Sequence, residues 1–266
     1  MTKKLYFTVT VFVALGVLGV KVYDNLDKDS SAEFRESFAK TEINSQQPPL
    51  VSPSNEATSS SNQPVQSEQS IVETRTPSEV AIVDSWLKRT GFSPISQKTY
   101  QEQYTEEQLI ELSESGDMIA TDALVSLYFD QGKSDEIKLS LLKRGIIQGS
   151  FNSISLMAIH HNSSSFVAPS AEKAKTSLKE SLAYLALLDL RGVGKASANH
   201  IKQDFYISTY MERHPDAEPI SDADEQYIRQ RAQELYDGYQ AERQQLGLGD
   251  FDNDMPEEAK RFFGYN

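Results

Sequence analysis

The first hydrophobic pattern along the chain is an uninterrupted apolar run near its start. Residues 5–20 carry no charge, and Lys3 and Lys4 precede them. As a helix this run is about 24 Å long. It approaches the roughly 30 Å of a bilayer core when Lys21 extends its ammonium group to the lipid headgroups. The pattern predicts a membrane anchor over residues 1–27.

The charges that flank this run predict its orientation. Lys3 and Lys4 are expected to stay in the cytoplasm, while Asp24, Asp27 and Asp29 lie on the other side. The predicted location is the inner (cytoplasmic) membrane, single-pass, with the body periplasmic or otherwise extracytoplasmic. A cleaved signal peptide is the alternative interpretation, and it leaves the body in the same compartment.

A long polar segment follows the anchor. Residues 28–78 are rich in Ser, Gln, Pro, Asn and Thr, and no aromatic residue occurs between Phe38 and Trp86. Such a segment cannot bury enough apolar area to offset the entropy lost on ordering. We therefore expect a disordered tether between the anchor and the folded part.

From residue 79 to residue 266 the apolar positions follow helical spacing, which predicts an all-α domain. Ile137 is expected to face inward, and the buried stripes of the last two long helices include Ile201 and Leu246 respectively. The aromatic tail, residues 261–266, is expected to pack on the last long helix, and an exposed tail that serves as a docking peptide is the alternative. The expected helical segments are residues 78–90, 105–116, 116–132, 134–147, 149–164, 170–191, 197–213 and 221–246.

Local signals at helix starts support this division. Thr105 with Gln108 fits a capping box, and Ser170 and Ser221 are expected N-caps. Acidic residues follow Ser221 at the positive end of the helix dipole. The long C-terminal helix is expected to cap the helical stack.

Two stretches of this domain repeat one pattern. Gly116 and Gly149 are 33 residues apart, and each begins a similar helical segment. These segments resemble Sel1-like repeats, a branch of the tetratricopeptide-like helical solenoids. The resemblance covers about residues 105–200 and implies a helical-repeat domain that presents a concave binding surface; an irregular helical bundle is the alternative. The matching residues are Gly116, Asp117, Ala120, Leu124, Leu127, Tyr128 and Gly132, then Gly149, Met157 and Ala158, then Ala183, Leu187, Arg191, Gly192, Val193 and Gly194.

Composition narrows the possible functions. The chain has no Cys, which excludes disulfides, thiolate nucleophiles and zinc–thiolate sites. Its formal net charge is −13, and residues 212–258 hold 14 acidic against 4 basic side chains. Such a surface repels nucleic-acid phosphates and favours a basic protein partner.

Candidate chemistry is sparse. His160 and His161 are adjacent, so on a helix they point about 100° apart and cannot easily share one metal ion. Asp250, Asp252 and Asp254 alternate as at the start of an EF-hand loop, although the Gly and Glu of that loop are replaced. A weak calcium site there stays open. We otherwise predict no catalytic, cofactor-binding or metal-binding residue.

The sequence therefore predicts a membrane-anchored protein–protein interaction module, either an adaptor or an inhibitor of the immunity-protein kind. The alternatives are an extracytoplasmic hydrolase of cell wall or lipid, and an accessory factor of an envelope assembly. The predicted contact residues for a partner are Tyr128, Phe129, Tyr206, Tyr210, Asp216, Glu218, Asp222 and Asp224.

Overall fold

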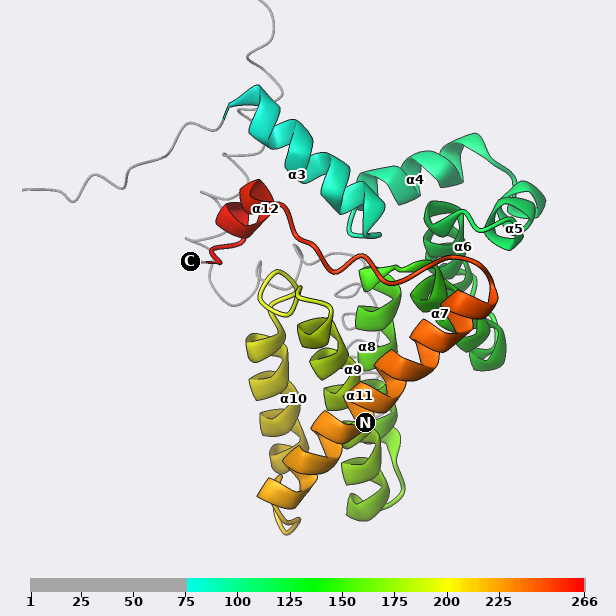
Figure 1. Cartoon of the computed structure of the whole chain (residues 1–266). Helices are drawn as coiled ribbons and strands as arrows, with labels where there is room; N and C mark the ends of the chain where they lie inside the picture. Colours follow the sequence, from blue (N-terminus) through cyan, green and yellow to red (C-terminus); the bar gives the residue numbers. More distant parts are fainter. Residues whose placement is uncertain (1–75, 266) are drawn as a thin grey trace, which may run out of the picture. The chain divides into compact units, whose positions relative to one another are not determined.

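The computed structural model describes residues 76–265. All regular secondary structure in that range is helical (Figure 1), which confirms the all-α prediction for this part of the chain. None of its helices is long and apolar enough to cross a membrane. The predicted anchor, residues 1–27, and the predicted tether up to residue 75 lie outside the described residues.

Ten helices, labelled α3 to α12, form over residues 76–265. Most begin with a capping side chain, and Thr76, Thr105 and Ser221 each form a full capping box. The predicted caps Thr105, Ser170 and Ser221 are all confirmed. The helices are α3 (Pro77–Arg89), α4 (Pro94–Gln103), α5 (Glu106–Glu114), α6 (Met118–Asp130), α7 (Asp135–Gln148), α8 (Phe151–Val167), α9 (Ala171–Leu190), α10 (Asn199–Arg213), α11 (Asp222–Gln245) and α12 (Glu257–Phe262).

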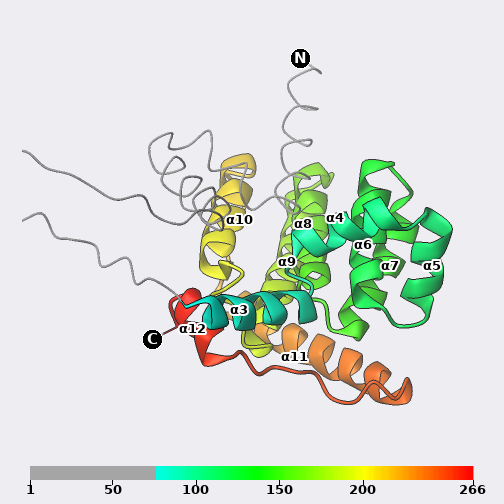
Figure 2. The same cartoon turned by 90° about the horizontal axis from the view of Figure 1, so that it is seen from above.

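Helices α8 and α9 form the centre of the core. They make the most extensive helix–helix contact among the described residues, and α9 also contacts α10 and α11. The apolar positions of α9 include Leu178, Leu182 and Leu185, all fully or almost fully buried. Figure 2 shows α10 on one side of this pair and α5, α6 and α7 on the other. The second half of α9, from Leu182 to Leu188, is apolar nearly all round, which explains the central position of this part of the helix.

A polar network joins α5, α6 and α7. The Ser113 and Thr121 hydroxyls are 2.8 Å apart, and Thr121 also donates to the Gln148 side chain at 2.6 Å. Gln148 donates in turn to the Ser113 carbonyl at 2.9 Å. Ser113 and Thr121 are buried, so these bonds satisfy groups that water cannot reach.

The two positions of the predicted repeat have the same local structure. Gly116 and Gly149 both adopt left-handed φ values, 101° and 113°. The residue after each glycine, Asp117 or Ser150, caps the next helix with its side chain. A glycine suits both positions because a side chain is strained at such φ values. The assignment to the Sel1-like family stays a prediction.

The C-terminal part of the chain returns to the first described helix. Helix α11 lies along α9 and also contacts α7, and the chain then runs back to α12, which packs on α3 (Figure 1). The tail does pack, but not on α11 as expected. The Phe263 ring lies 5.8 Å from the Trp86 ring of α3, and the Tyr265 hydroxyl accepts the Ala196 N–H at 2.9 Å.

Three expected core residues lie at the surface instead. Ile137 is 44% exposed because the buried positions of α7 begin only at Leu141. Ile201 is 50% exposed because α10 buries the face that carries Tyr206 and Tyr210. Leu246 is 66% exposed because α11 ends at Gln245, and the buried stripe of α11 ends before that residue.

Helices α4 and α12 were absent from the sequence prediction. Helix α4 has a Ser93 cap followed by Pro94, which is a local start signal, but it contains no buried residue. Its sequence therefore lacks the apolar stripe on which periodicity analysis depends. Helix α12 has only six residues, too short for a periodic pattern.

Candidate functional site

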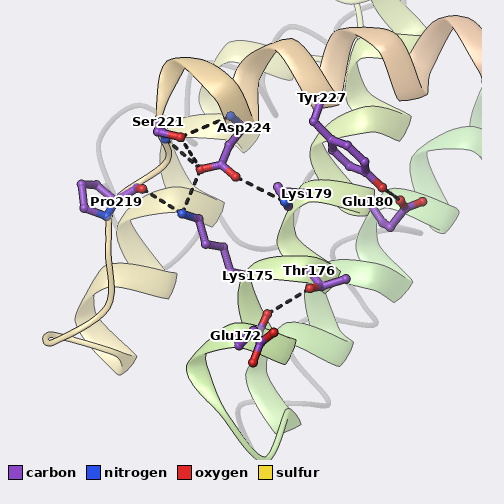
Figure 3. Close-up of polar contacts among 9 residues, drawn as sticks. All are labelled: Glu172, Lys175, Thr176, Lys179, Glu180, Pro219, Ser221, Asp224 and Tyr227. Carbon is purple, nitrogen blue, oxygen red and sulfur yellow. Dashed lines mark hydrogen bonds and ion pairs between the residues drawn. The ribbon is translucent and has the colours of Figure 1, made fainter.

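One carboxylate holds the start of α11 against α9 (Figure 3). The Asp224 side chain forms ion pairs with Lys175 at 2.8 Å and Lys179 at 3.2 Å. The Ser221 backbone N–H and hydroxyl donate to the same carboxylate at 3.0 and 2.7 Å. We call these four residues the Asp224 clamp.

The sequence sets up this clamp locally on each helix. Lys175 and Lys179 are four residues apart and therefore lie on one face of α9. Asp224 is the third residue of α11, where a carboxylate returns a hydrogen bond to the cap residue. The hydrogen bonds from Lys175 and Ser221 hold the pKa of Asp224 well below its ordinary value. The clamp is therefore ionised at neutral pH.

Three exposed carboxylates lie close to Ser221 and Asp224 of the clamp in the chain. Asp216 and Glu218 lie in the loop between α10 and α11, and Asp222 is the first residue of α11. None of the three forms an ion pair with another described residue, in contrast to Asp224. We call Asp216, Glu218 and Asp222 the acidic corner. Its exposed charge can attract a basic group from solution, and Glu218 also interacts electrostatically with Lys175 of the clamp.

The predicted aromatic contact residues are placed differently from the acidic ones. Tyr128, Tyr206 and Tyr210 are buried in the core. Phe129 is half-buried, with the Lys138 ammonium 4.9 Å from its ring. Of the eight predicted contact residues, only those of the acidic corner lie fully at the surface and close together in the chain.

The adjacent histidines belong to an aromatic cluster. The His161 ring stacks on Tyr184 at 5.4 Å, and the Tyr184 and Tyr239 hydroxyls are 3.1 Å apart. Burial lowers the pKa of both His160 and His161 from the ordinary value. This cluster joins α8, α9 and α11 through packing and one buried hydrogen bond.

The alternating aspartates do not converge. Asp250 accepts hydrogen bonds from Gln240 and Gln244, while Asp252 pairs with Arg89 at 3.1 Å. Between residues 76 and 265, no group of three His, Cys, Asp or Glu side chains is arranged to hold a metal ion. These contacts link α11, α3 and the segment between α11 and α12.

Sequence reasoning missed a fully buried carboxylate in α6. Asp122 is completely buried, and its oxygens accept hydrogen bonds from Ser150 at 2.8 Å and from Ser153 at 2.9 Å. Ser150 is also the N-cap of α8. A Cβ atom at Gly91 would lie 2.5 Å from Asp122 Oδ2, and one at Gly145 would lie 2.1 Å from Ser153 Oγ. Both glycines therefore make room for this cluster.

No described cation pairs with Asp122, so its charge is costly. Burial raises the pKa of Asp122 to about 7, although the hydrogen bonds from Ser150 and Ser153 act in the opposite direction. The only signal in the sequence is one acidic residue within the apolar segment of α6. Such a residue cannot be distinguished from an outward-facing one until the neighbouring helices are placed.

Two buried arginines were also missed. Arg191 follows α9, Arg243 lies in the last turn of α11, and both are at least nine-tenths buried. Neither forms an ion pair with a described carboxylate. Burial lowers the pKa of Arg191 to about 9, and the neighbouring positive charge of Arg243 acts in the same direction. A guanidinium so placed is recognised only from the assembled fold.

Comparison with protein-family models, with curated proteins and with solved structures yields no match to this chain. The features that bear on function are the acidic corner at the surface and the charged groups in the interior.

Proposed function

We propose that this chain is a membrane-anchored protein–protein interaction module, whose folded part binds a basic protein outside the cytoplasm. The observation that carries the proposal is the acidic corner. Asp216, Glu218 and Asp222 are exposed without an ion-pair partner among the described residues, directly beside a clamp in which the equivalent charge is paired.

The rigidity of this region supports a binding role. The Asp224 clamp and the capping box at Ser221 fix the start of α11 on α9, so Asp222 is held in a defined position. A preorganised charged surface loses little conformational entropy when a partner binds. The net charge of −13 adds long-range attraction for a basic partner and disfavours nucleic acid.

The anchor and the compartment are supported by the sequence. The uncharged run of residues 5–20, with Lys3 and Lys4 before it, fits a single membrane-spanning helix with its N-terminus in the cytoplasm. The folded part is then periplasmic or extracytoplasmic. Fractionation of cells that express the full chain tests this: the protein should require detergent for extraction, and external protease should reach it only after the outer barrier is opened.

The repeat architecture is part of the same proposal. The matching local structure at Gly116 and Gly149 supports helix pairs of the Sel1-like kind, with α11 as the proposed capping helix in contact with α9 and α7. Helical solenoids commonly serve as adaptors through their concave surfaces.

The partner is tested by crosslinking the full chain in cells and comparing two triple variants. One carries Asp216→Lys, Glu218→Lys and Asp222→Lys. The control carries Glu107→Lys, Glu111→Lys and Glu114→Lys, which are exposed carboxylates on α5. It is matched because each triple reverses three charges and includes one position in the first turn of a helix.

A basic protein should be captured by the wild type and by the α5 variant, and lost with the corner variant. Equal capture by both variants would reject the acidic corner as the contact surface. Recovery of the full chain from the soluble fraction without detergent would reject the anchor separately.

A further inference from the structure

The segment that connects α11 to α12 binds the rest of the domain as an extended peptide would. Residues 248–256, here called the strap, have no helical structure and run back along the domain (Figure 1). Two of its side chains, Phe251 and Met255, are buried, while Asp250, Asp252 and Asp254 between and beside them are exposed. The strap is thus an acidic segment with one buried aromatic side chain.

Two guanidinium groups contact the Phe251 ring. The Arg191 guanidinium carbon is 3.9 Å from the centre of this ring, and the Arg243 carbon is 4.6 Å from it. Arg191 also lies 4.6 Å from the Phe151 ring, and Tyr236 packs on Phe251 with 5.6 Å between the ring centres. Cation–ring contacts of this kind strengthen when water is excluded.

The remaining contacts involve both the backbone and the side chains of the strap. Arg243 donates to the carbonyls of Leu248 at 3.1 Å and Gly249 at 3.3 Å, and Arg191 donates to the Asp252 carbonyl at 3.4 Å. Gln240 accepts the Phe251 N–H at 2.9 Å. Among the side chains, Asn253 accepts from Arg191 at 2.6 Å, Asp250 accepts from Gln240 at 2.6 Å, and Asp252 pairs with Arg89 at 3.1 Å. Another extended segment can satisfy the backbone bonds, and one with acidic side chains can take the places of Asp250 and Asp252.

The surface beneath the strap has a hydrogen-bond donor without an acceptor and two guanidinium groups without an ion-pair partner among the described residues. Arg191 Nη1 is buried and has no hydrogen-bond acceptor. Neither guanidinium has an ion-pair partner among the described carboxylates, so the surface is cationic once the strap is lifted. We call Phe151, Arg191, Gln240 and Arg243 the strap seat.

We propose that the strap seat is a peptide-binding site that the chain's own strap occupies, and that its external ligand is an extended acidic segment with one aromatic side chain. The ring takes the place of Phe251, and flanking carboxylates are attracted by Arg191 and Arg243. This site is separate from the acidic corner and does not depend on it, because it selects a partner of the opposite charge.

In the wild type, the strap competes with any external peptide. A segment tethered at both ends acts at an effective concentration in the millimolar range. An external peptide therefore gains access only when the strap is weakened. Loss of the Phe251 ring removes the contact with both guanidiniums and should favour exchange by about tenfold or more.

The test uses the full chain with Phe251→Ala and a fluorescent peptide that copies residues 248–257. Fluorescence anisotropy should show binding to the variant at least about tenfold tighter than to the wild type. A peptide with Ala in place of its Phe should lose that gain. The control chain carries Phe129→Ala, which removes one Lys–Phe contact elsewhere and should bind no better than wild type.

Phe251→Leu replaces Phe251→Ala if circular dichroism shows that the latter is not helical, and the same outcomes apply. The proposal is overturned if a folded strap variant binds neither peptide, or binds both equally. It is also overturned if light scattering shows a wild-type dimer that Phe251→Ala dissociates, since the seat would then take the strap of a second copy.

Discussion

Two aspartates in this domain each join two helices through polar contacts, but their electrostatic surroundings are opposite. Asp122 joins α6 to the start of α8 through two serine hydroxyls, and burial raises its pKa to about 7. Asp224 joins α11 to α9 through two lysines, which hold its pKa well below the ordinary value. The difference shows that the surroundings of a carboxyl group decide whether it joins the helices in its protonated form or as an anion.

The comparison predicts opposite dependences of stability on pH. The folded state keeps a proton on Asp122 between about pH 4 and pH 7, where the unfolded chain has released it. The free energy of unfolding should therefore fall as the pH rises through this window. For Asp224 the sign is reversed. Its stabilisation is present above the ordinary pKa and is lost as the pH falls below it.

The largest expected effect is seen with Asp122→Asn. This substitution removes the titrating group. The free energy of unfolding of the variant, relative to that of the wild type, should therefore rise by on the order of 4 kcal/mol between pH 4 and pH 8. Urea denaturation over a pH series measures it. His160 and His161 contribute the opposite slope in both proteins, so they cancel in the difference curve. Parallel curves for wild type and variant would contradict a raised pKa.

The second effect reverses a simple rule of helix propensity. Gly145 is inside α7, where alanine normally stabilises by about 1 kcal/mol. Here the added Cβ would lie 2.1 Å from Ser153 Oγ and would disturb its bond to Asp122. Gly145→Ala should therefore destabilise by about 2 kcal/mol, measured by urea denaturation at neutral pH.

Gly238 in α11 provides the control for this substitution. A Cβ atom there would meet no other atom within 4 Å. Gly238→Ala should stabilise by about 1 kcal/mol, as propensity predicts. If both substitutions stabilise, the Asp122 cluster is looser than the distances indicate.

The sequence predicts the contacts that each site makes within one helix, but not the contacts between helices. Ser221 is recognised as a cap because its partner Asp224 is three residues away. Lys175 and Lys179, which pair with Asp224, are more than forty residues away and have no sequence link to it. Helix starts and the all-α class are predictable for the same reason, since both depend on spacing within a few turns.

Buried charge is the part that sequence reasoning cannot reach. In the sequence, nothing distinguishes Asp122 and Arg191 from an exposed aspartate or arginine. Only the assembled fold shows that they are buried. The partners of Asp122 come from α8, and the rings around Arg191 come from α8 and the strap. The missed helix α4 has a related cause, because it buries no side chain of its own.

A smaller effect is expected at the Asp224 clamp. Asp224→Asn removes the charge that holds both lysines and weakens the capping box, and should cost about 1 kcal/mol at pH 7. Asp222→Asn is the matched control, because Asp222 lies two residues earlier, is exposed and forms no ion pair with a described residue. It should change the free energy of unfolding by only a few tenths of a kcal/mol. Equal losses from the two substitutions would show that the lysine pairs contribute nothing.

The smallest expected effect is a difference in salt dependence between the substitutions at Asp224 and at Asp122. At about 1 M salt the screening length falls to about 3 Å, and partly exposed ion pairs such as those of Asp224 weaken. The destabilisation by Asp224→Asn should then shrink by a few tenths of a kcal/mol relative to low salt. The effect of Asp122→Asn at pH 8 should not change, because Asp122 is fully buried and ions cannot approach it. Denaturation of both variants and wild type at two salt concentrations measures this. An equal salt response at the two sites would contradict the distinction between a fully buried acid and a partly exposed, paired anion.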